Sequence, residues 1–390
     1  VLYGLELADR AIEHFGLPSE DTQRIELFER WERFWSLATV EYRRGLMERS
    51  DPDNMRGVRG VRNAWRSGER PLPLEFQLLS RQSELGGLGA YLSSLRRYGL
   101  VSPGTLRLGR AEAHEIVAAF WRESGERDSS GAYHDYALSA LDPDTKTTPR
   151  RRGKLTLRTI GKCSRLSSLV ELGRTAQQNR LWNALFEGTV DATLPLAQQI
   201  IAAHREGVTS PEDVLVGLSS SRWGELAPAI TKYVTTALAF ARAARILLDR
   251  FNRVYASVVE AGMVATFDAA ANAAFGAKDP DLQRTCEALL SSPTVGRFRD
   301  LQYHGPNFVT AVARIISGDT RDRLDALLEL HGSVQKSRRG GGPWLRREHD
   351  KLILQGPTYN GYMDEALFPG LKIGSVRSLL FDLGRLDETA

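Results

Sequence analysis

The sequence predicts a mainly α-helical fold: a helical bundle body, a winged-helix-like module and a small C-terminal element of a β-hairpin and helices. Three observations support this prediction. Apolar residues recur every three or four positions over most of the chain, as on one face of an amphipathic helix. Alternation with a period of two, typical of strands, is confined to short runs. Polar stretches rich in Gly, Ser and Pro separate the helical segments.

The composition is that of an ordinary globular protein, with 390 residues of which 42% are hydrophobic and 26% charged. No apolar run reaches the ~18 residues of a transmembrane helix, and no signal peptide is recognisable. We therefore expect no membrane partner. Two cysteines, Cys163 and Cys286, make no disulfide framework and are typical of a reducing cytoplasm. The chain begins at Val1, already in a helical pattern, so we expect a segment to be missing upstream.

The chain is expected to contain five segments. They are N-terminal helices over 1–69, the winged-helix-like module over 70–123, a basic linker over 124–163, a helical domain over 164–335 and a C-terminal hairpin with helices over 336–390. The boundaries are placed where polar, Gly-rich or Pro-rich stretches interrupt the apolar spacing.

The first segment begins with two clear amphipathic helices. One covers 2–15 and ends at Gly16, a residue suited to a helix C-terminus. The next runs from about 20 to 47 and carries an apolar stripe of Ile25, Phe28, Trp31, Trp35, Leu37, Ala38 and Tyr42. A third helix is expected over 54–66.

Residues 73–121 are predicted to form helix, turn, helix, turn, strand and helix. Gly86 and Gly87 allow a tight turn between the first two helices, and the alternating run at 105–108 predicts a short strand. This order resembles the winged-helix modules of bacterial regulators, in which a helix ending in Gly-Leu-Val, here 99–101, precedes a small wing. The resemblance implies the fold more specifically than the function.

A winged helix can place its second helix in the major groove of DNA and its wing on the backbone. Arg96 and Arg97 end that helix here, and Arg107 lies on the predicted wing. The helix over 87–98 has no Asn or Gln that would read bases, and many winged helices bind only protein. A DNA contact and a protein-docking role both remain open.

The most basic stretch is PRRRGKLTLRTIGK at 149–162, with six positive side chains and no acidic one. Its cations are Arg150, Arg151, Arg152, Lys154, Arg158 and Lys162. Clustered Arg and Lys suit nucleic-acid phosphates, because each neutralised phosphate releases counterions. The alternative is a solvated loop, or arginines that pair with carboxylates elsewhere in the fold. The alternation around 154–160 also predicts a short strand.

Beyond residue 164 helical spacing dominates. Helices are expected at about 193–206, 211–218 and 225–262 and within 279–333, the last stretch interrupted at Ser292–Pro293 and at Gly318. The long helix over 225–262 is interpreted as a core or dimer helix with solvated arginines. Near the C-terminus, Trp344–Arg346 and Lys351–Leu354 predict a hairpin, and helices are expected over 360–367 and 375–384.

A second basic cluster flanks the glycines at 340–342. It consists of Lys336, Arg338, Arg339, Arg346 and Arg347. Because glycine lets backbone approach a phosphate closely, this cluster is predicted to make a second contact with nucleic acid.

No catalytic or cofactor motif is recognisable. The sequence has no phosphate-binding P-loop, no nucleophile elbow and no paired-histidine zinc helix. The pairs His134–Asp135 and His349–Asp350, and the segment LDPDTK at 141–146, lack the further ligands that metal-dependent hydrolases and nucleases need. We therefore assign no catalytic, cofactor-binding or metal-ligating residue and expect no cofactor; an enzyme with an unfamiliar site stays as a third alternative.

Four segments occur in a characteristic order: RIELFERWERFWSLATV (24–40), RGVRGVRNAW (56–65), LEFQLLSRQSELGGLGAYLSSLRRYGLV (74–101) and SSLVELGRTAQQNRLWNALFEG (167–188). Together they resemble a poorly characterised bacterial family encoded in genomic islands of phage-defence and mobile-element genes. The resemblance implies a bacterial, cytoplasmic protein that acts with protein partners in a complex. It carries over no catalytic residues.

These observations predict a non-enzymatic nucleic-acid-binding subunit, with DNA favoured, in a bacterial defence or mobile-element complex. The alternative is a protein-interaction scaffold that recruits a helicase or nuclease without binding DNA. The net charge of +4 does not distinguish them; the distribution of charge on the folded surface does.

Overall fold

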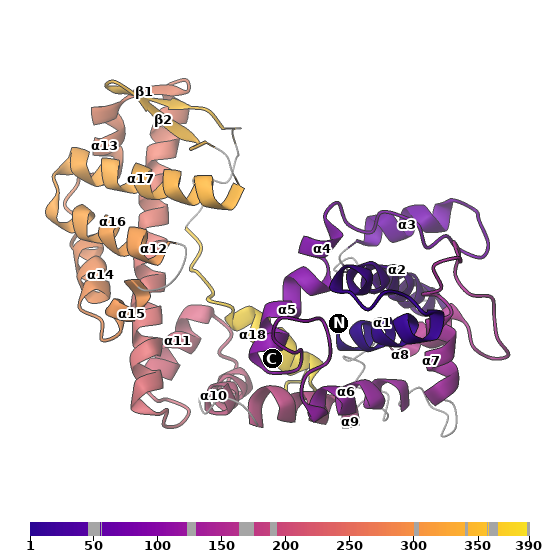
Figure 1. Ribbon diagram of the computed structural model, residues 1–390. Coiled ribbons are helices and arrows are strands. Elements are labelled where there is room, and N and C mark those ends of the chain that lie inside the picture. Colours follow the sequence, from indigo (N-terminus) through magenta and orange to yellow (C-terminus); the bar gives the residue numbers. More distant parts are fainter. Residues whose placement is uncertain are drawn as a thin grey trace. The chain divides into compact units, whose positions relative to one another are not determined.

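The computed structural model describes residues 1–45, 55, 57–122, 130–163, 175–187, 193–299, 304–339, 342–356, 358 and 366–387. It is mainly helical with one small antiparallel sheet, as predicted (Figure 1). The described part of the chain contains no helix with both the length and the apolar character needed to cross a membrane.

The chain folds into two compact units rather than being organised along the five expected segments. Unit 1 comprises Val1–Thr193 and Leu380–Asp387, and unit 2 comprises Leu194–Leu379 and Glu388–Ala390. Each unit has its own hydrophobic core.

Unit 1 is built almost entirely from helices. They are α1 (Leu2–Phe15), α2 (Asp21–Gly45), α3 (Val58–Arg66), α4 (Gln82–Leu85), α5 (Gly87–Arg97), α6 (Ala111–Arg122), α7 (Ser130–Leu138), α8 (Leu157–Cys163), α9 (Thr175–Trp182) and the π-helical turn η2 (Asn183–Glu187). The predicted helices over 2–15 and 20–47 are confirmed as α1 and α2. Gly16 ends α1 in the left-handed conformation, with φ of 63°.

The core of unit 1 forms around α2. Phe28, Trp31 and Phe34 on its apolar stripe are almost fully buried. Helix α8 packs closely against α2 because residue 161 is a glycine: a Cβ there would collide with the carbonyl of Ala38. The close approach of these helices therefore depends on Gly161.

The strand predicted around 154–160 is wrong. Only a single β-bridge joins Arg152 and Leu155, and α8 begins two residues later. Leu155, before α8, and Ile160, within it, are both buried, so this stretch packs into the core of unit 1 without forming a strand. Residues 130–163 thus contribute to the core of unit 1 and are not simply a basic linker.

The region expected to be winged-helix-like keeps its second and third helices as α5 and α6 but retains only the short α4 of the first, and it has little β-structure. The segment before α4 is irregular instead of helical, and the predicted strand at 105–108 is reduced to one bridge between Val101 and Leu108. Residues 72–74 pair with 146–148 instead. This long-range pairing explains why local helix propensity fails there.

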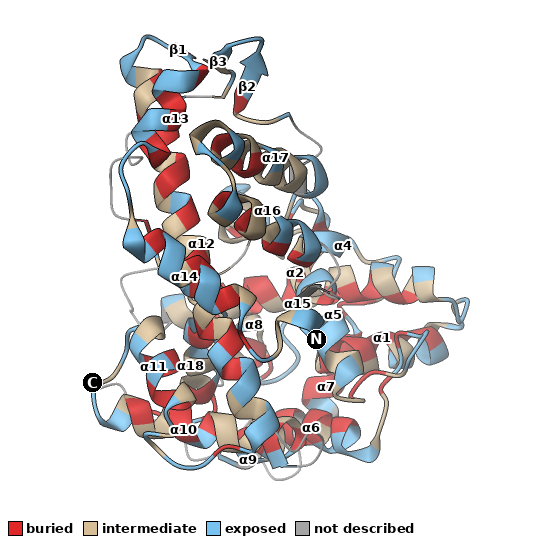
Figure 2. Ribbon diagram, turned by 90° about the vertical axis from the view of Figure 1, so that its left-hand side faces the viewer, coloured by how far each residue is buried: buried red, intermediate tan, exposed pale blue. Residues whose placement is uncertain are grey.

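Unit 2 contains the remaining helices and the sheet. Its elements are α10 (Thr193–Arg205), α11 (Pro211–Ser219), α12 (Pro228–Glu260), β1 (Val264–Thr266), α13 (Phe267–Phe275), α14 (Pro280–Leu290), α15 (Val295–Arg299), α16 (Gly305–Ser317), α17 (Thr320–Arg339), β2 (Leu345–Glu348), β3 (Lys351–Leu354) and α18 (Ile373–Asp382). The first residue of α10 and residues 380–382 of α18 belong to unit 1. The predicted long helix and the interruptions near 292 and 318 are confirmed. Figure 2 shows α12 with buried and exposed sides.

The predicted C-terminal hairpin is confirmed as β2 and β3, which pair with Glu348 opposite Lys351. The short strand β1 was not predicted; it completes a sheet with the order β1-β3-β2. Leu345 and Leu352 are buried under this sheet. Of the helix expected over 360–367, residues 360–365 lie outside the described residues, and 366–367 are not helical.

Arg250 on α12 is buried instead of solvated as expected. Only 6% of the residue is exposed. Its guanidinium donates to the carbonyl of Ala274 at 3.1 Å and pairs with Asp279. Asp279 also caps α14, because its carboxylate accepts hydrogen bonds from the amides of Asp281 and Leu282 at 2.9 and 3.1 Å.

We predict that Asp279→Ala lowers the free energy of unfolding of unit 2 by about 3 kcal/mol, because it leaves a buried guanidinium unpaired and removes a helix cap. Asp281→Ala is the matched control, since its ion pair with Arg284 is exposed and is expected to contribute under ~1 kcal/mol. Urea denaturation measures both. Equal losses in the two variants would contradict the buried-pair interpretation.

His331 joins α17 to the hairpin. Its ring stacks on Phe251 with centroids 4.4 Å apart, and its Nε2 accepts a hydrogen bond from the backbone amide of Trp344 at 3.2 Å. That bond requires the neutral imidazole. Burial lowers the pKa of His331 from 6.5 to about 4.

Because the unfolded chain binds this proton more tightly, the contribution of His331 is complete above pH 6.5 and is lost as the pH falls towards 4. We predict a loss of about 2 kcal/mol over this window, and a smaller pH dependence in His331→Leu. Chemical denaturation at a series of pH values measures the free energy of unfolding of the wild-type protein and of the variant. The titration of carboxylates, which both proteins share, cancels in the difference. Parallel pH profiles would be the contrary result.

Candidate nucleic-acid interface

The basic run of unit 1 follows a segment that is held in place by backbone pairing. The amide of Leu74 donates to the carbonyl of Lys146 at 2.9 Å, and the amide of Thr148 donates to the carbonyl of Leu72 at 2.7 Å. The amide of Leu72 also donates to Oγ1 of Thr148, a residue that is 3% exposed. The chain therefore leaves the core at 148 in a defined direction.

Arg30 on α2 fixes the preceding loop. Its guanidinium donates to the carbonyl of Ala140 at 2.6 Å and also to the carbonyl of Thr145. Desolvation by burial lowers the pKa of Arg30, although the carboxylates of Glu75 and Asp142 act in the opposite direction. A single, partly buried cation thus holds two points of the loop between α7 and the basic run.

Tyr136 on α7 makes a further anchor. Its hydroxyl donates to the carbonyl of Pro149 at 3.1 Å. Burial raises the pKa of Tyr136 to about 12, so the hydroxyl keeps its proton at neutral pH. The hydrogen bond ends immediately before the first arginine of the run.

Residues Arg150–Lys154 form a tight exposed turn, here called the basic turn. The amide of Leu155 donates to the carbonyl of Arg152 at 2.9 Å, and the reverse bond is 3.2 Å. Gly153 has a φ of 59°, a conformation that glycine adopts without strain. Nε of Arg151 donates to the carbonyl of Gly153 at 2.7 Å, which steadies the turn further.

The basic turn carries four exposed cations: Arg150, Arg151, Arg152 and Lys154. Within the described residues, none of the four forms an ion pair with a carboxylate. Arg158 is exposed on the first turn of α8; Lys162 lies in the same helix, and its side chain is outside the description. The structure therefore presents a concentrated positive charge on a backbone that is already ordered.

The three arginines of the expected winged-helix-like module are differently placed. Arg96 donates to the carbonyl of Thr105 at 2.9 Å and thereby closes the turn after α5. Arg107 donates to Oγ of Ser19 at 3.1 Å and lies 4.0 Å from Asp9. Arg97 is exposed and makes no ion pair with a described residue. Two of the three are thus engaged within unit 1.

The second basic cluster belongs to unit 2 and is partly neutralised. Arg347 pairs with Asp325 at 2.6 Å and lies over the ring of Phe267. Arg346 pairs with Glu348 at 3.2 Å. Lys336 is exposed on α17. Arg338 and Arg339 end that helix, but their side chains are not among those that the structure describes.

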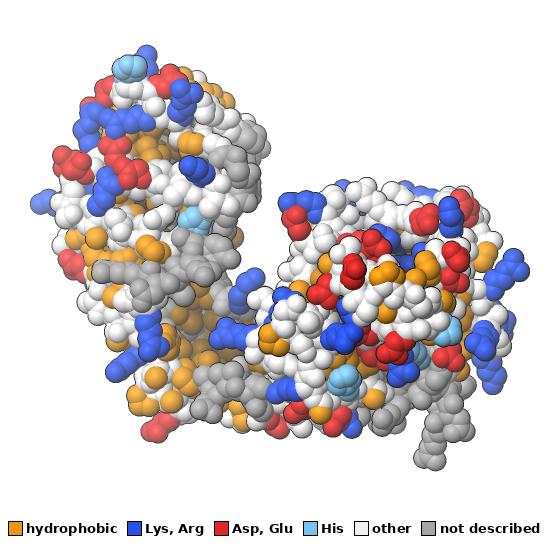
Figure 3. All heavy atoms as spheres, viewed as in Figure 1, with side chains coloured by type: hydrophobic (Ala, Val, Ile, Leu, Met, Phe, Trp, Pro, Cys, Tyr) orange, Lys and Arg blue, Asp and Glu red, His pale blue; other side chains and the backbone are white. Residues whose placement is uncertain are grey.

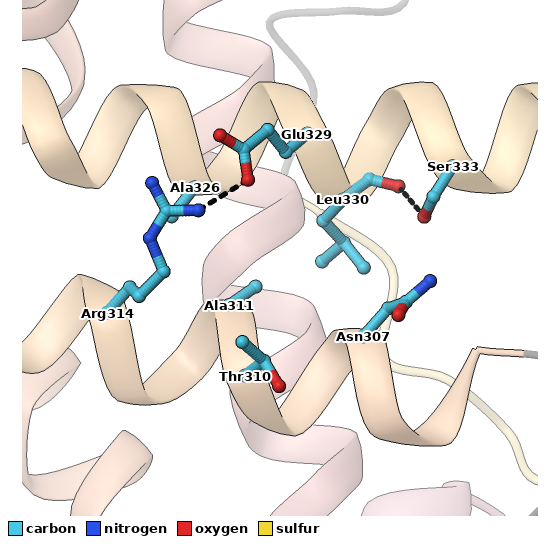
Figure 4. Close-up of a pocket in the computed structure, with 8 residues that line it drawn as sticks. All are labelled: Asn307, Thr310, Ala311, Arg314, Ala326, Glu329, Leu330 and Ser333. Carbon is cyan, nitrogen blue, oxygen red and sulfur yellow. Dashed lines mark hydrogen bonds and ion pairs between the residues drawn. The ribbon is translucent and has the colours of Figure 1, made fainter.

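Two surface hollows in unit 2 lack the features of a catalytic site. One, of about 250 Å³, lies between α16 and α17, where Arg314 and Glu329 pair beside small alanines (Figure 4). The other, of about 460 Å³, is lined by residues of 207–222. Neither lining contains a histidine or cysteine, and the described residues include no group of three or more His, Cys, Asp or Glu able to hold one metal ion.

Comparison of the chain with protein-family models, curated proteins and solved structures gave no match. Its function must therefore be inferred from the geometry and charge of its own surface.

We predict that Arg30→Met lowers the free energy of unfolding of unit 1 by about 2–3 kcal/mol, because two carbonyls lose a charged donor. Hydrogen exchange at the amides of 145–155 should accelerate as the turn loses its anchor. Arg33→Met on the same helix is the control, since its bond to Glu29 is long, at 3.5 Å, and partly exposed. Unchanged exchange in Arg30→Met would contradict the anchoring role.

Proposed function

We propose that this protein is a non-enzymatic nucleic-acid-binding subunit that contacts the phosphate backbone chiefly through the basic turn. The observation that supports this most directly is the presence of four exposed cations without a carboxylate partner among the described residues. An arginine that is already paired must break its ion pair to reach a phosphate, whereas an unpaired one loses only hydration. The ordered backbone of the turn also reduces the entropy lost on binding.

The other predicted contacts have smaller roles in this proposal. In unit 2 we assign phosphate contact to Lys336, because Arg346 and Arg347 would first have to leave Glu348 and Asp325. We propose a reduced winged-helix-like module in which α5, the following turn and α6 support unit 1. Only Arg97 of its three arginines is available for DNA.

The proposed setting is a bacterial defence or mobile-element complex. The support for it is the order of the four segments that resemble the bacterial family of phage-defence islands. The alternative, a protein-interaction scaffold, is favoured by two exposed apolar side chains on the adjacent helices α4 and α5. Leu85 is 40% exposed and Tyr91 is 58% exposed. A partner helicase or nuclease would bury them without requiring the basic turn.

We predict that Arg150→Ala/Arg151→Ala/Arg152→Ala weakens binding of labelled DNA about 10–100-fold at 0.1 M salt and reduces the slope of log K against log salt by about 2–3. Fluorescence anisotropy over a salt series, with duplex and single-stranded DNA, measures both quantities. Since the three side chains are exposed, the variant should keep its thermal stability.

The matched control removes three exposed, paired arginines: Arg81→Ala/Arg222→Ala/Arg284→Ala. It lowers the net charge equally and should change affinity by less than about threefold, because surface pairs contribute little. A wild-type protein that binds no DNA at low salt, or a basic-turn variant that behaves like this control, would refute the proposed function.

A further inference from the structure

Helix α3 presents a face of arginines that the sequence interpretation did not assign. Arg59, Arg62 and Arg66 follow a spacing of three and four residues, which places them within about 60° around the helix. Arg59 and Arg66 are exposed and form no ion pair with any described residue. Arg62 is half-buried.

The opposite face of α3 fixes this orientation. Val61 and Ala64 are buried, at 0% and 4% exposed. At Gly60 a Cβ would collide with the carbonyl of Gln77, so the helix packs backbone to backbone on the segment before α4. The arginine face must therefore point away from the core.

Two more guanidinium groups extend the face at the C-terminal end of α3. Arg44, from the end of α2, and Arg70 lie over the ring of Trp65, with 4.8 and 4.7 Å between each guanidinium carbon and the ring centroid. Arg70 also donates to the carbonyl of Glu69 at 2.5 Å. A second N–H group of Arg70 donates to the carbonyl of Trp65 at 3.4 Å. Stacking on an aromatic ring holds a guanidinium in place, and the N–H groups that no carbonyl engages stay available for phosphate.

The pairing of 72–74 with 146–148 joins this face to the basic turn. Pro73 lies opposite Thr147 in antiparallel register. Arg70, three residues before Pro73, and Arg150, three residues after Thr147, therefore lie at the same end of the two paired segments. Figure 1 shows the loop between α7 and α8 projecting at the edge of unit 1, and Figure 3 shows Lys and Arg side chains gathered at the same edge.

The two segments joined by this pairing, 57–70 and 146–158, carry mostly positive side chains. Residues 57–70 have four arginines and one carboxylate, that of Glu69, and residues 146–158 have six cations and no carboxylate. Three acidic residues of the sequence between α2 and α3, Glu48, Asp51 and Asp53, lie outside the described residues. Such a concentration of like charge repels itself in the free protein, and an anionic polymer would neutralise it.

We propose that Arg59, Arg66 and Arg70, with Arg44, continue the phosphate-binding track of the basic turn, and that its ligand is a nucleic-acid duplex. This inference rests on the proposed function. Proteins that hold single strands stack bases on aromatic rings, but here the ring of Trp65 is engaged by guanidinium groups. Arg59 and Arg66 are about 10 Å apart along the helix axis, which corresponds to about three base pairs of duplex rise.

The test combines two double variants, Arg59→Ala/Arg66→Ala for the helix face and Arg150→Ala/Arg152→Ala for the turn, with their quadruple combination. The control is Arg81→Ala/Arg284→Ala, which removes two paired, exposed arginines. The probes are a labelled DNA duplex, an RNA duplex of the same sequence and a single DNA strand of the same length, each over a salt series. The two duplex probes distinguish DNA from RNA as the source of the phosphates.

The helix-face variant is expected to weaken duplex binding about 5–20-fold and to reduce the salt slope by about two. The helix-face and turn effects should add on a logarithmic scale, because the two groups contact different phosphates. Arg59→Lys/Arg66→Lys should restore the slope, which also separates a charge effect from misfolding. The wild-type protein should bind the single strand more weakly than either duplex.

Three results would be decisive against the inference. If the turn variant loses affinity while the helix-face variant matches the control, the extended track is wrong and the proposed function stands. If the wild-type protein prefers the single strand, the duplex assignment is wrong. If it binds none of the probes, the proposed function and this inference fall together.

Discussion

The position of the basic turn depends on the partly buried guanidinium of Arg30. Placing this cation inside unit 1 costs solvation, as the lowered pKa reflects, and the carbonyls of Ala140 and Thr145 offset the cost. With both ends of that loop held, the next residues can pair with 72–74, and Thr148 becomes buried. The exposed arginines then begin from an ordered backbone. A ligand gains their charge without first ordering a mobile loop.

Whether the cations of a basic segment form ion pairs with carboxylates, more than their number, decides if the segment can serve as an interface. The chain has 52 Lys and Arg against 48 Asp and Glu, so the two charges are nearly balanced in number and many cations can find a carboxylate in the fold. Arg347 and Arg250 illustrate this, one at the hairpin and one in the core. The basic turn differs because its neighbours along the chain include no acid, and because the segment paired with it leads to another arginine, Arg70.

The helices were predictable where apolar spacing is regular and packing simply reinforces it, as in α2 and α12. The hairpin was predictable because its strands are close in sequence. Contacts between distant residues were not predictable. The end of the alternating stretch at 154–160 lies in α8, where Gly161 fits against Ala38. At the start of α5 the amide of Gly87 donates a hydrogen bond to the carboxylate of Glu32, a residue 55 positions earlier. The basic stretch was identified from the sequence. Only the fold shows that the cations of the basic turn form no ion pair with a carboxylate among the described residues.

The arginines of α3 are instructive because the sequence does contain their signal. A spacing of three and four residues between like charges, opposite Gly, Val and Ala, marks a solvated helix face with an apolar back. What the sequence lacks is the connection to residues near 150, which depends on a pairing across more than 70 positions. In the proposed track, folding brings two ordinary basic stretches together through the pairing of 72–74 with 146–148. Their mutual repulsion opposes the folded state, and a polyanion that spans both would relieve it, so binding and the stability of unit 1 are linked.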